Sequence, residues 1–295
     1  MPRLVVGMPA YNAERTIQRA VLSTLRAMPD DSRLVVLDDA STDGTVAVLE
    51  SIKDRRLSVI ASSENSGSGV VRNRILAETD SEFFAVMDAD DVSLRWRFAL
   101  QMKAARSVDV VFGAAVRFDS HKARARPSAP LALRPHELPT ALLFHNPLWH
   151  SSFLARRSAI ETVGGYSSGR CGQDYELWLR LADSGATMYR LSVPVGGYRE
   201  SSNQITKRDD YREKVRNFDE MRHAYINLFN SRVRGVSLDP DLSASAVSER
   251  IQVGLREQLQ VFRPLNRVYY SRLVRTCRSS DLLMYRVFPD DSATQ

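Results

Sequence analysis

Three aspartates directly follow a short apolar run at residues 83–87: Asp88, Asp90 and Asp91. Carboxylates one residue apart in a turn can point the same way, and their hard oxygens suit a Mg²⁺ or Mn²⁺ ion that holds a diphosphate. Such an ion would neutralise the negative charge that builds up on a departing diphosphate. An isolated Asp-x-Asp is usually an ordinary solvated loop, so this interpretation depends on the sequence around it.

Two more polar clusters follow apolar runs in the same way. Residues 11–12 (Tyr-Asn) come after the run at 4–8, and residues 38–39 (Asp-Asp) close the run at 34–37. Ligands of open α/β sheets bind beyond the carboxyl ends of the strands. If the runs are neighbouring parallel strands, all three clusters lie at one ligand-binding edge.

The spacing of apolar residues over the first 115 positions supports that arrangement. Short buried strands are predicted at residues 4–8, 34–37, 57–61, 83–87 and 108–112. Between them, helical spacing predicts a helix after an N-cap at Asn12, a second to about Lys53 and a third to about Thr79. Alternating strands and helices predict an α/β, Rossmann-like fold with a mostly parallel central sheet flanked by helices.

The rest of the chain has a different pattern. Residues 120–139 are rich in Pro, Ala and Arg and are expected to be an irregular connection. A helix is predicted from about Tyr175, with Trp178 in its apolar stripe and Gly185 at its end. Residues 211–288 have a helical pattern broken by Pro240 and Pro264, and residues 289–295 are expected to be disordered.

The composition excludes several protein classes. The net charge of +6 favours anionic partners without determining the fold. Two cysteines in 295 residues make neither a disulfide scaffold nor a zinc motif. No apolar stretch reaches the roughly 18 residues of a membrane span. We therefore expect a cytoplasmic protein with reduced thiols, and no nucleic-acid reading module is present.

The motifs together resemble the family 2 glycosyltransferases, which have a GT-A fold. The resemblance covers residues 4–199 and follows the order of the family's motifs. They are Pro-Ala-Tyr-Asn at 9–12, Asp-Asp-Ala-Ser-Thr-Asp-Gly-Thr at 38–45, Asn-Ser-Gly at 65–67, Arg-Asn at 72–73, Asp-Ala-Asp-Asp at 88–91, Gly-Gly-Tyr at 164–166 and Gln-Asp-Tyr-Glu-Leu-Trp-Leu-Arg-Leu at 173–181.

The resemblance implies transfer of a sugar from a nucleoside diphosphate donor, with UDP the expected nucleotide, to a saccharide, lipid-linked or other hydroxyl acceptor. It implies that Tyr11 and Asp39 hold the base, that Asp88 contacts the ribose or a metal-bound water, and that Asp90 is the direct ligand of Mn²⁺ or Mg²⁺. The implied nucleotide-sugar site comprises Pro9, Ala10, Tyr11, Asn12, Glu14, Asp39, Asn65, Gly67, Arg72, Asp88, Ala89 and Asp90. The implied acceptor side comprises His150, Gln173 and Trp178.

Asp174 resembles the family's catalytic base, which removes the proton of the attacking hydroxyl and leads to inversion at the sugar. The alternative is that Asp174 only caps the helix that follows. Two departures from the family pattern accompany it. Gln173 replaces the usual Glu, and no histidine follows Tyr198-Arg199, so metal binding would depend on Asp90 with water, or on another residue such as His150.

Three functional parts are expected: a nucleotide-sugar half at 1–115, an acceptor and base half at 116–205, and a helical C-terminal extension at 206–295. Two other functions remain open. A nucleotidyltransferase would have a Gly-rich basic loop after its first strand, where this chain has Met-Pro-Ala-Tyr-Asn. A non-catalytic sugar-nucleotide binding module would not need both Asp90 and Asp174.

The C-terminal part is basic and amphipathic, with seven arginines between Gly254 and Phe288. One interpretation is a peripheral contact with anionic lipid at the inner face of the membrane. The other is a helix packed on the catalytic domain with its arginines in water. Co-sedimentation with acidic liposomes distinguishes the two, because only the first predicts binding at moderate salt.

Overall fold

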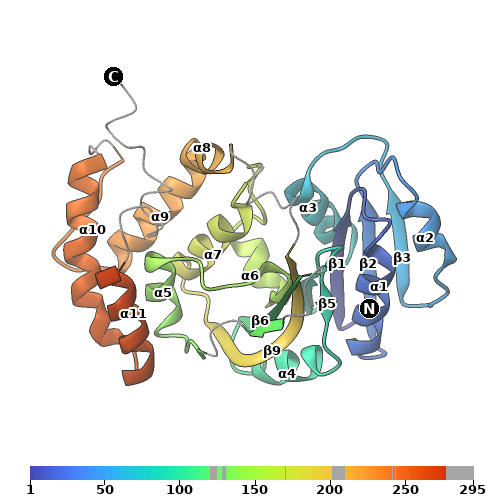
Figure 1. The fold of residues 1–295 in the computed structure, drawn as a ribbon, viewed down its shortest axis with the longest axis horizontal. Coiled ribbons are helices and arrows are strands. Elements are labelled where there is room, and N and C mark those ends of the chain that lie inside the picture. Colours follow the sequence, from blue (N-terminus) through green and yellow to red (C-terminus); the bar gives the residue numbers. More distant parts are fainter. Residues whose placement is uncertain are drawn as a thin grey trace. The chain divides into compact units, whose positions relative to one another are not determined.

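The computed structural model describes residues 1–119, 125–127, 131–169, 171–200, 210–240, 242 and 244–276 (Figure 1). The chain forms two compact units and passes between them several times. Unit 1 contains residues 1–132, 148–168 and 189–202, and unit 2 contains residues 133–147, 169–188 and 203–295. Segments 133–147 and 169–188 thus belong to the same unit as the C-terminal helices, a grouping that differs from the three functional parts expected from the sequence.

Unit 1 is built on one nine-stranded sheet with the order β3-β2-β1-β4-β8-β6-β9-β5, and β7 pairs with β6. Its strands are β1 Leu4–Ala10, β2 Ser32–Asp38, β3 Leu57–Ala61, β4 Phe83–Val86, β5 Val92–Ser93, β6 Val110–Asp119, β7 Ala125–Pro127, β8 Leu154–Arg156 and β9 Met188–Glu200. Its helices are α1 Ile17–Ala27, α2 Thr45–Ser51, α3 Ser68–Glu78, α4 Arg97–Ala104, α6 Arg157–Thr162 and the short 3₁₀ turn η1 His150–Ser152.

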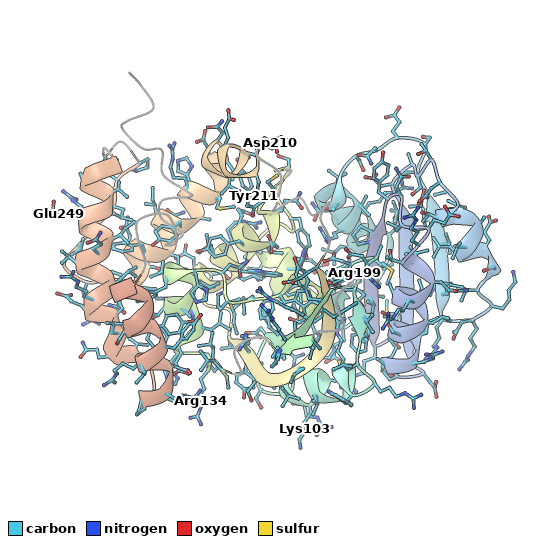
Figure 2. All side chains as sticks on the ribbon, viewed as in Figure 1. Lys103, Arg134, Arg199, Asp210, Tyr211 and Glu249 are labelled. Atoms are coloured by element: carbon cyan, nitrogen blue, oxygen red, sulfur yellow. The ribbon has the colours of Figure 1, made fainter. Side chains whose placement is uncertain are left out.

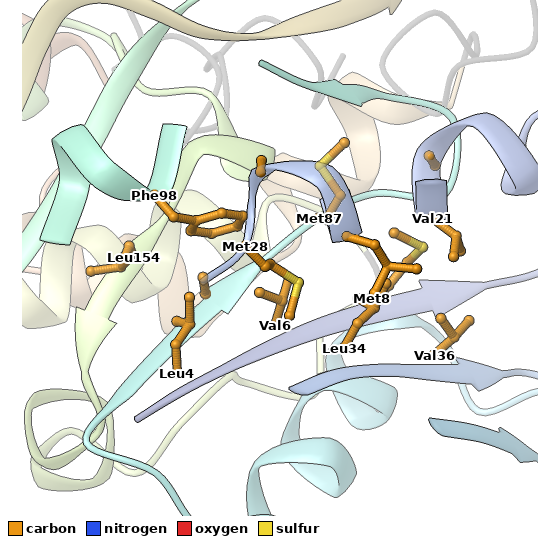
Figure 3. Packing of buried hydrophobic residues seen from close by; sticks show 14 of the residues in the cluster. Leu4, Val6, Met8, Val21, Met28, Leu34, Val36, Met87, Phe98 and Leu154 are labelled. Atoms are coloured by element: carbon orange, nitrogen blue, oxygen red, sulfur yellow. The ribbon is translucent and has the colours of Figure 1, made fainter. Parts of the chain in front are cut away.

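Helices cover both faces of the β1 region because alternate residues of a strand point to opposite sides. Leu4, Val6 and Met8 pack with Val21 and other α1 residues in the buried core (Figure 3). On the opposite face a Cβ added to Gly7 would lie 2.9 Å from Phe84 Cζ and 3.4 Å from the Ile75 side chain of α3. The α/β layering expected from the apolar runs is therefore confirmed.

The sheet is mixed. β1 pairs in parallel with β2 and β4, and β2 pairs in parallel with β3, as the alternation of strands and helices predicts. The pairings β4–β8, β6–β8, β6–β7 and β5–β9 are antiparallel. Because the parallel strands run the same way, β1, β2 and β4 bring the polar clusters that follow them to one edge of the sheet.

Unit 2 is helical. It contains α5 Leu138–Phe144, α7 Gln173–Asp183, α8 Tyr211–Arg216, α9 Asp219–Arg232, α10 Ala244–Gln258, the 3₁₀ turn η3 Leu259–Val261 and α11 Pro264–Thr276. α7 and α9 both bond to the end of α5, since Tyr175 Oη donates to Leu142 O and Tyr225 Oη donates to Leu143 O.

The predicted helical extension is confirmed as far as Thr276, with Pro264 as the first residue of α11. A proline suits that position because its missing N–H would have no partner there. The predicted disordered tail at 289–295 lies outside the described residues. Within the described ranges, no helix is both long and apolar enough to cross a bilayer.

Candidate active site

The loop after β1 is braced against the loop after β2. Asn12 lies in the left-handed region with φ of 48°, its N–H donates to Ser41 Oγ over 2.9 Å, and its Oδ1 accepts the Thr42 N–H over 2.8 Å. The prediction that Asn12 caps the first helix is wrong, because Thr16 is the N-cap of α1 and makes no side-chain cap bond. Asn12 instead fixes the loop that carries Tyr11, a residue that is 53% exposed.

Glu14 completes the same brace. Its N–H donates to Asp43 Oδ2 over 3.2 Å, and its Oε2 accepts the Gly44 N–H over 3.3 Å. Pro9 and Ala10 are the last residues of β1, paired with Leu37 and Asp38 of β2. These predicted nucleotide-site residues therefore shape the edge of the sheet.

Asp39 is buried and binds the loop before α3. Its carboxylate accepts the Ser66 N–H and hydroxyl, both over 2.9 Å, and the Gly67 N–H over 2.8 Å. Asn65 Nδ2 donates to the Asp39 carbonyl over 3.1 Å. The structure thus brings Asp39, Asn65 and Gly67 together, as the motifs imply. A carboxylate offers about four acceptor positions, so roughly one remains for a base N–H.

Arg72 and Asp88 form a partly buried ion pair at the edge. Arg72 is only 5% exposed, and its Nη2 donates to Asp88 Oδ1 over 2.8 Å. Burial alone would raise the pKa of Asp88, but the Arg72 charge, with a hydrogen bond from Ser151, outweighs it and lowers the pKa below its ordinary value. Asp88 is therefore ionised. Among the described residues, Arg72 Nε has no hydrogen-bond partner although it is buried.

His150 lies beside this pair and stays neutral. Its Nε2 is 2.9 Å from Tyr166 Oη, and the Arg72 guanidinium carbon is 5.6 Å from the centre of the Tyr166 ring. Burial, followed by the charge of Arg72, lowers the pKa of His150 to about 3. The side-chain amide of Asn73 fixes the backbone of Tyr166: its Nδ2 donates to Tyr166 O and its Oδ1 accepts the Tyr166 N–H, each over 2.8 Å. Nε2 of His150 is thus in contact with Tyr166, and a role for His150 as a metal ligand stays a prediction.

Ser151 joins Asp88 to Asp91 and indicates where a proton is held. Its Oγ lies 2.8 Å from Asp88 Oδ2 and 2.6 Å from Asp91 Oδ2. A serine hydroxyl has one proton, so one of the two contacts needs a proton from the carboxyl group. Burial and the charges of Asp88 and Asp90 raise the pKa of Asp91 well above its ordinary value, which assigns this proton to Asp91.

Asp91 also accepts two hydrogen bonds, and the one from Arg199 lowers its pKa, against the larger effects of burial and of its acidic neighbours. Its Oδ2 accepts the Trp149 Nε1–H over 3.1 Å, and its Oδ1 accepts the Arg199 N–H over 2.9 Å. The partners of these contacts are 58 and 108 positions apart in the sequence, so no local sequence pattern predicts them. The roles of Ser151 and Trp149 therefore could not be predicted from the sequence.

Asp90 differs from its neighbours because its carboxylate is left available. No side chain among the described residues donates a hydrogen bond to this carboxylate. It accepts a hydrogen bond from the backbone N–H of Asp90 itself. Burial and the charge of Asp88 raise the pKa of Asp90 to about 6, with Arg199 acting in the opposite direction. Ala89 separates it from Asp88, so one aspartate of the motif is paired and the other is not.

The residues present fit a hard divalent cation bound through few protein ligands. The described part of the chain contains no cluster of three or more His, Cys, Asp or Glu side chains that could enclose an ion. Mg²⁺ commonly binds through one or two carboxylates and fills its other positions with water and substrate phosphate oxygens. Asp90 provides such a carboxylate, whereas Asp88 is engaged by Arg72 and Ser151.

Unit 2 contains the predicted base and two predicted acceptor-side residues. Asp174 is the second residue of α7, whose N-cap is Gly172 with φ of 74°, so the interpretation of Asp174 as the N-cap is wrong. Gln173 begins the helix and is 7% exposed. Trp178 is fully buried. Its apolar bulk lies in the core, and its assignment to the acceptor side stays a prediction.

Comparison with known proteins agrees with this geometry. Residues 5–164 match the family described as Glycosyl transferase family 2. EpsE of Bacillus subtilis, provisionally named a glycosyltransferase, is 29% identical over 219 residues, covering 70% of this chain and 76% of EpsE.

Two solved structures share the fold. TarS 1–349 of S. aureus in complex with UDP-GlcNAc superposes with a TM-score of 0.60 at 17% identity, covering 96% of this chain and 89% of that one. The mannosyltransferase PcManGT of Pyrobaculum calidifontis, in complex with GDP-Man and Mn²⁺, has a TM-score of 0.53 at 19% identity, covering 88% and 72%. With the GT-A fold and more than half of its length matched to the family, this chain is a glycosyltransferase of family 2.

Proposed function

We propose that this glycosyltransferase moves a sugar from a nucleoside diphosphate sugar to an acceptor hydroxyl with inversion. The observation that carries the proposal is the Asp90 carboxylate, which no described side chain pairs with, beside the paired Asp88 at the edge formed by β1, β2 and β4. A divalent cation at Asp90 would supply Lewis-acid neutralisation of the departing diphosphate. The Mn²⁺ in the PcManGT complex and the UDP-GlcNAc in the TarS complex support this assignment.

The residues of the chain have separate tasks in this proposal. Tyr11 packs on the base, and Asp39 accepts a base N–H. Arg72 keeps Asp88 ionised and in place. Asp174 accepts the proton of the acceptor hydroxyl while that oxygen attacks the anomeric carbon and the bond from that carbon to the diphosphate breaks. UDP is the proposed nucleotide, on grounds of resemblance.

The acceptor is proposed as a saccharide or lipid-linked hydroxyl compound. Peripheral contact with anionic lipid remains a prediction. On α11, Leu265 is 72% exposed and Val268 is 57% exposed. The arginines described nearby also have structural tasks: Arg263 pairs with the buried Glu137 over 3.1 Å, and Arg267 Nη2 donates to two backbone carbonyls. Arg278 and Arg286 lie outside the described residues.

A thermal-shift panel tests the proposal without knowledge of the acceptor. UDP-, GDP- and dTDP-sugars are added to the protein with and without Mn²⁺. A ligand that binds only the folded state adds about 2.7 kcal/mol at one hundred times its Kd. We expect sugars of one nucleotide, UDP first, to raise the Tm, and to raise it further with Mn²⁺. If none of these donors shifts the Tm under either condition, the proposed function is wrong.

A further inference from the structure

Phe118, near the end of β6, has two arginines against its ring. The guanidinium carbon of Arg19, from α1, is 5.6 Å from the ring centre, and that of Arg199, from β9, is 5.0 Å from it. A guanidinium held against an aromatic ring keeps its N–H groups directed outward, in a geometry that matches phosphate oxygens. Two such groups on one ring concentrate positive charge in a small volume.

Arg199, one of the two arginines, lies beside the acidic turn. Arg199, labelled in Figure 2, donates from Nε to the backbone oxygen of Asp90 over 2.9 Å, and its N–H donates to Asp91 Oδ1 over 2.9 Å. These bonds tie both the side chain and the backbone of Arg199 to the turn that carries the Asp90 carboxylate. A phosphate bound at Asp90 through a cation would therefore meet the guanidinium of Arg199 close by.

The arginines of the edge are balanced by carboxylates to different extents, and Arg199 already faces the charge of Asp90. Asp88 already has Arg72 as its partner, so that cation is committed. Arg19 is exposed on α1, and no carboxylate within the described ranges forms an ion pair with it. Holding two like charges at one ring costs free energy that a bridging anion would recover. A leaving nucleoside diphosphate gains negative charge at the moment the sugar departs.

We infer that Arg19 and Arg199, held against Phe118, bind the diphosphate of the donor and stabilise it as the sugar leaves. The inference rests on the proposed function. In the step concerned, the acceptor oxygen forms a bond to the anomeric carbon, and the electron pair of the broken bond goes to the diphosphate oxygen. The positive charges of the two guanidiniums stabilise the negative charge on that oxygen. The two arginines thereby supply the positive charge that a histidine after Tyr198-Arg199 would otherwise provide, in a chain where Glu200 follows instead.

Calorimetric binding of UDP and of uridine to the whole protein with Mn²⁺ tests this role. Arg19→Met keeps an unbranched apolar stem against Phe118 and removes the charge. We expect UDP affinity to fall about tenfold, as for a lost charge-assisted bond, while uridine affinity stays unchanged. Arg19→Lys should restore part of the loss. Arg26→Met, an exposed arginine in the last turn of the same helix, is the matched control and should bind both ligands normally.

The outcomes separate this inference from the proposed function. If Arg19→Met binds UDP as tightly as wild type, the inference is overturned, and an accompanying rise in the acceptor KM would assign the arginines to a phosphate of the acceptor. If uridine affinity falls in parallel with UDP affinity, the residue acts on the structure of the site and not on phosphate. The proposed function itself fails if the wild-type protein binds UDP no more tightly than uridine and GDP no more tightly than guanosine.

Discussion

Asp90→Asn is expected to abolish sugar transfer and at the same time to stabilise the metal-free protein. The amide keeps the size of the side chain but removes the charge that a cation needs. Lewis-acid assistance contributes several kcal/mol to such a transition state, so kcat should fall about a thousandfold or more. Steady-state kinetics with saturating donor and Mn²⁺ measure this loss.

The gain in stability follows from the pKa of Asp90, which rises from 3.8 to about 6 in the folded protein. A carboxyl group whose pKa is raised on folding favours the folded state below its unfolded pKa. That advantage is lost as the pH rises from about 4 through about 6. Two pKa units correspond to at most about 3 kcal/mol, and partial exposure of Asp90 reduces this to roughly 1–2 kcal/mol. The Tm of the metal-free variant at pH 7.5 should therefore rise by about 2–6 °C.

Asp91→Asn is the matched control for activity. Asp91 is already neutral in the bonding scheme, so the amide can donate to Ser151 in place of the carboxyl proton and loses chiefly the acceptor for Trp149. Its kcat should stay within about tenfold of wild type, the cost of one hydrogen bond. Equal losses in Asp90→Asn and Asp91→Asn would refute the separate roles given to these two residues.

Asp174→Asn is expected to lower kcat by about 10²–10⁴-fold, the usual contribution of a general base. Donor affinity should stay unchanged, since the amide keeps the shape of the side chain and only proton removal is lost. Isothermal titration with the donor and single-turnover kinetics separate these two quantities. A simple helix-terminus role would instead affect stability and leave kcat intact.

Asp183→Asn provides the control for this variant. It makes the same chemical change at the last position of α7, where Asp183 Oδ1 accepts the Ser231 hydroxyl over 2.8 Å. Normal kcat is expected. Full activity in Asp174→Asn would remove Asp174 from the mechanism, whereas lost donor binding in that variant would show that the substitution disturbs more than the proton transfer.

The parallel part of the fold could be predicted because its signals are local. Residues 57–61 form β3 with the predicted bounds, and the runs at 4–8 and 34–37 lie inside β1 and β2. The antiparallel part could not be predicted in the same way. The run predicted at 108–112 became the ten-residue β6, and β8 has only three residues, too few for a periodic pattern. Their pairing depends on contacts between distant segments, which a single sequence does not reveal.

In the candidate site, too, residues in local motifs could be predicted and residues joined by distant contacts could not. The motifs at the ends of β1, β2 and β4 were recognisable because each follows an apolar run, and the structure brings Asp39, Asn65 and Gly67 into contact. Trp178, predicted at the acceptor side, is fully buried, and its motif did not predict this because an aromatic residue in a motif can pack in the core or contact a ligand. The network through Ser151 and Arg199 depends on tertiary contacts, so its residues were indistinguishable from ordinary polar positions.

Phosphorus NMR of the donor during turnover tests the central claim most directly. The protein is incubated with the nucleotide sugar that raises its Tm, with Mn²⁺ and with an acceptor or water as the nucleophile. If the bond between the anomeric carbon and the diphosphate breaks, the signals of a free nucleoside diphosphate appear. These signals should be absent when the Asp90→Asn variant is used. Pyrophosphate or nucleoside monophosphate as the released product would contradict the account, because the bond broken would then lie at phosphorus.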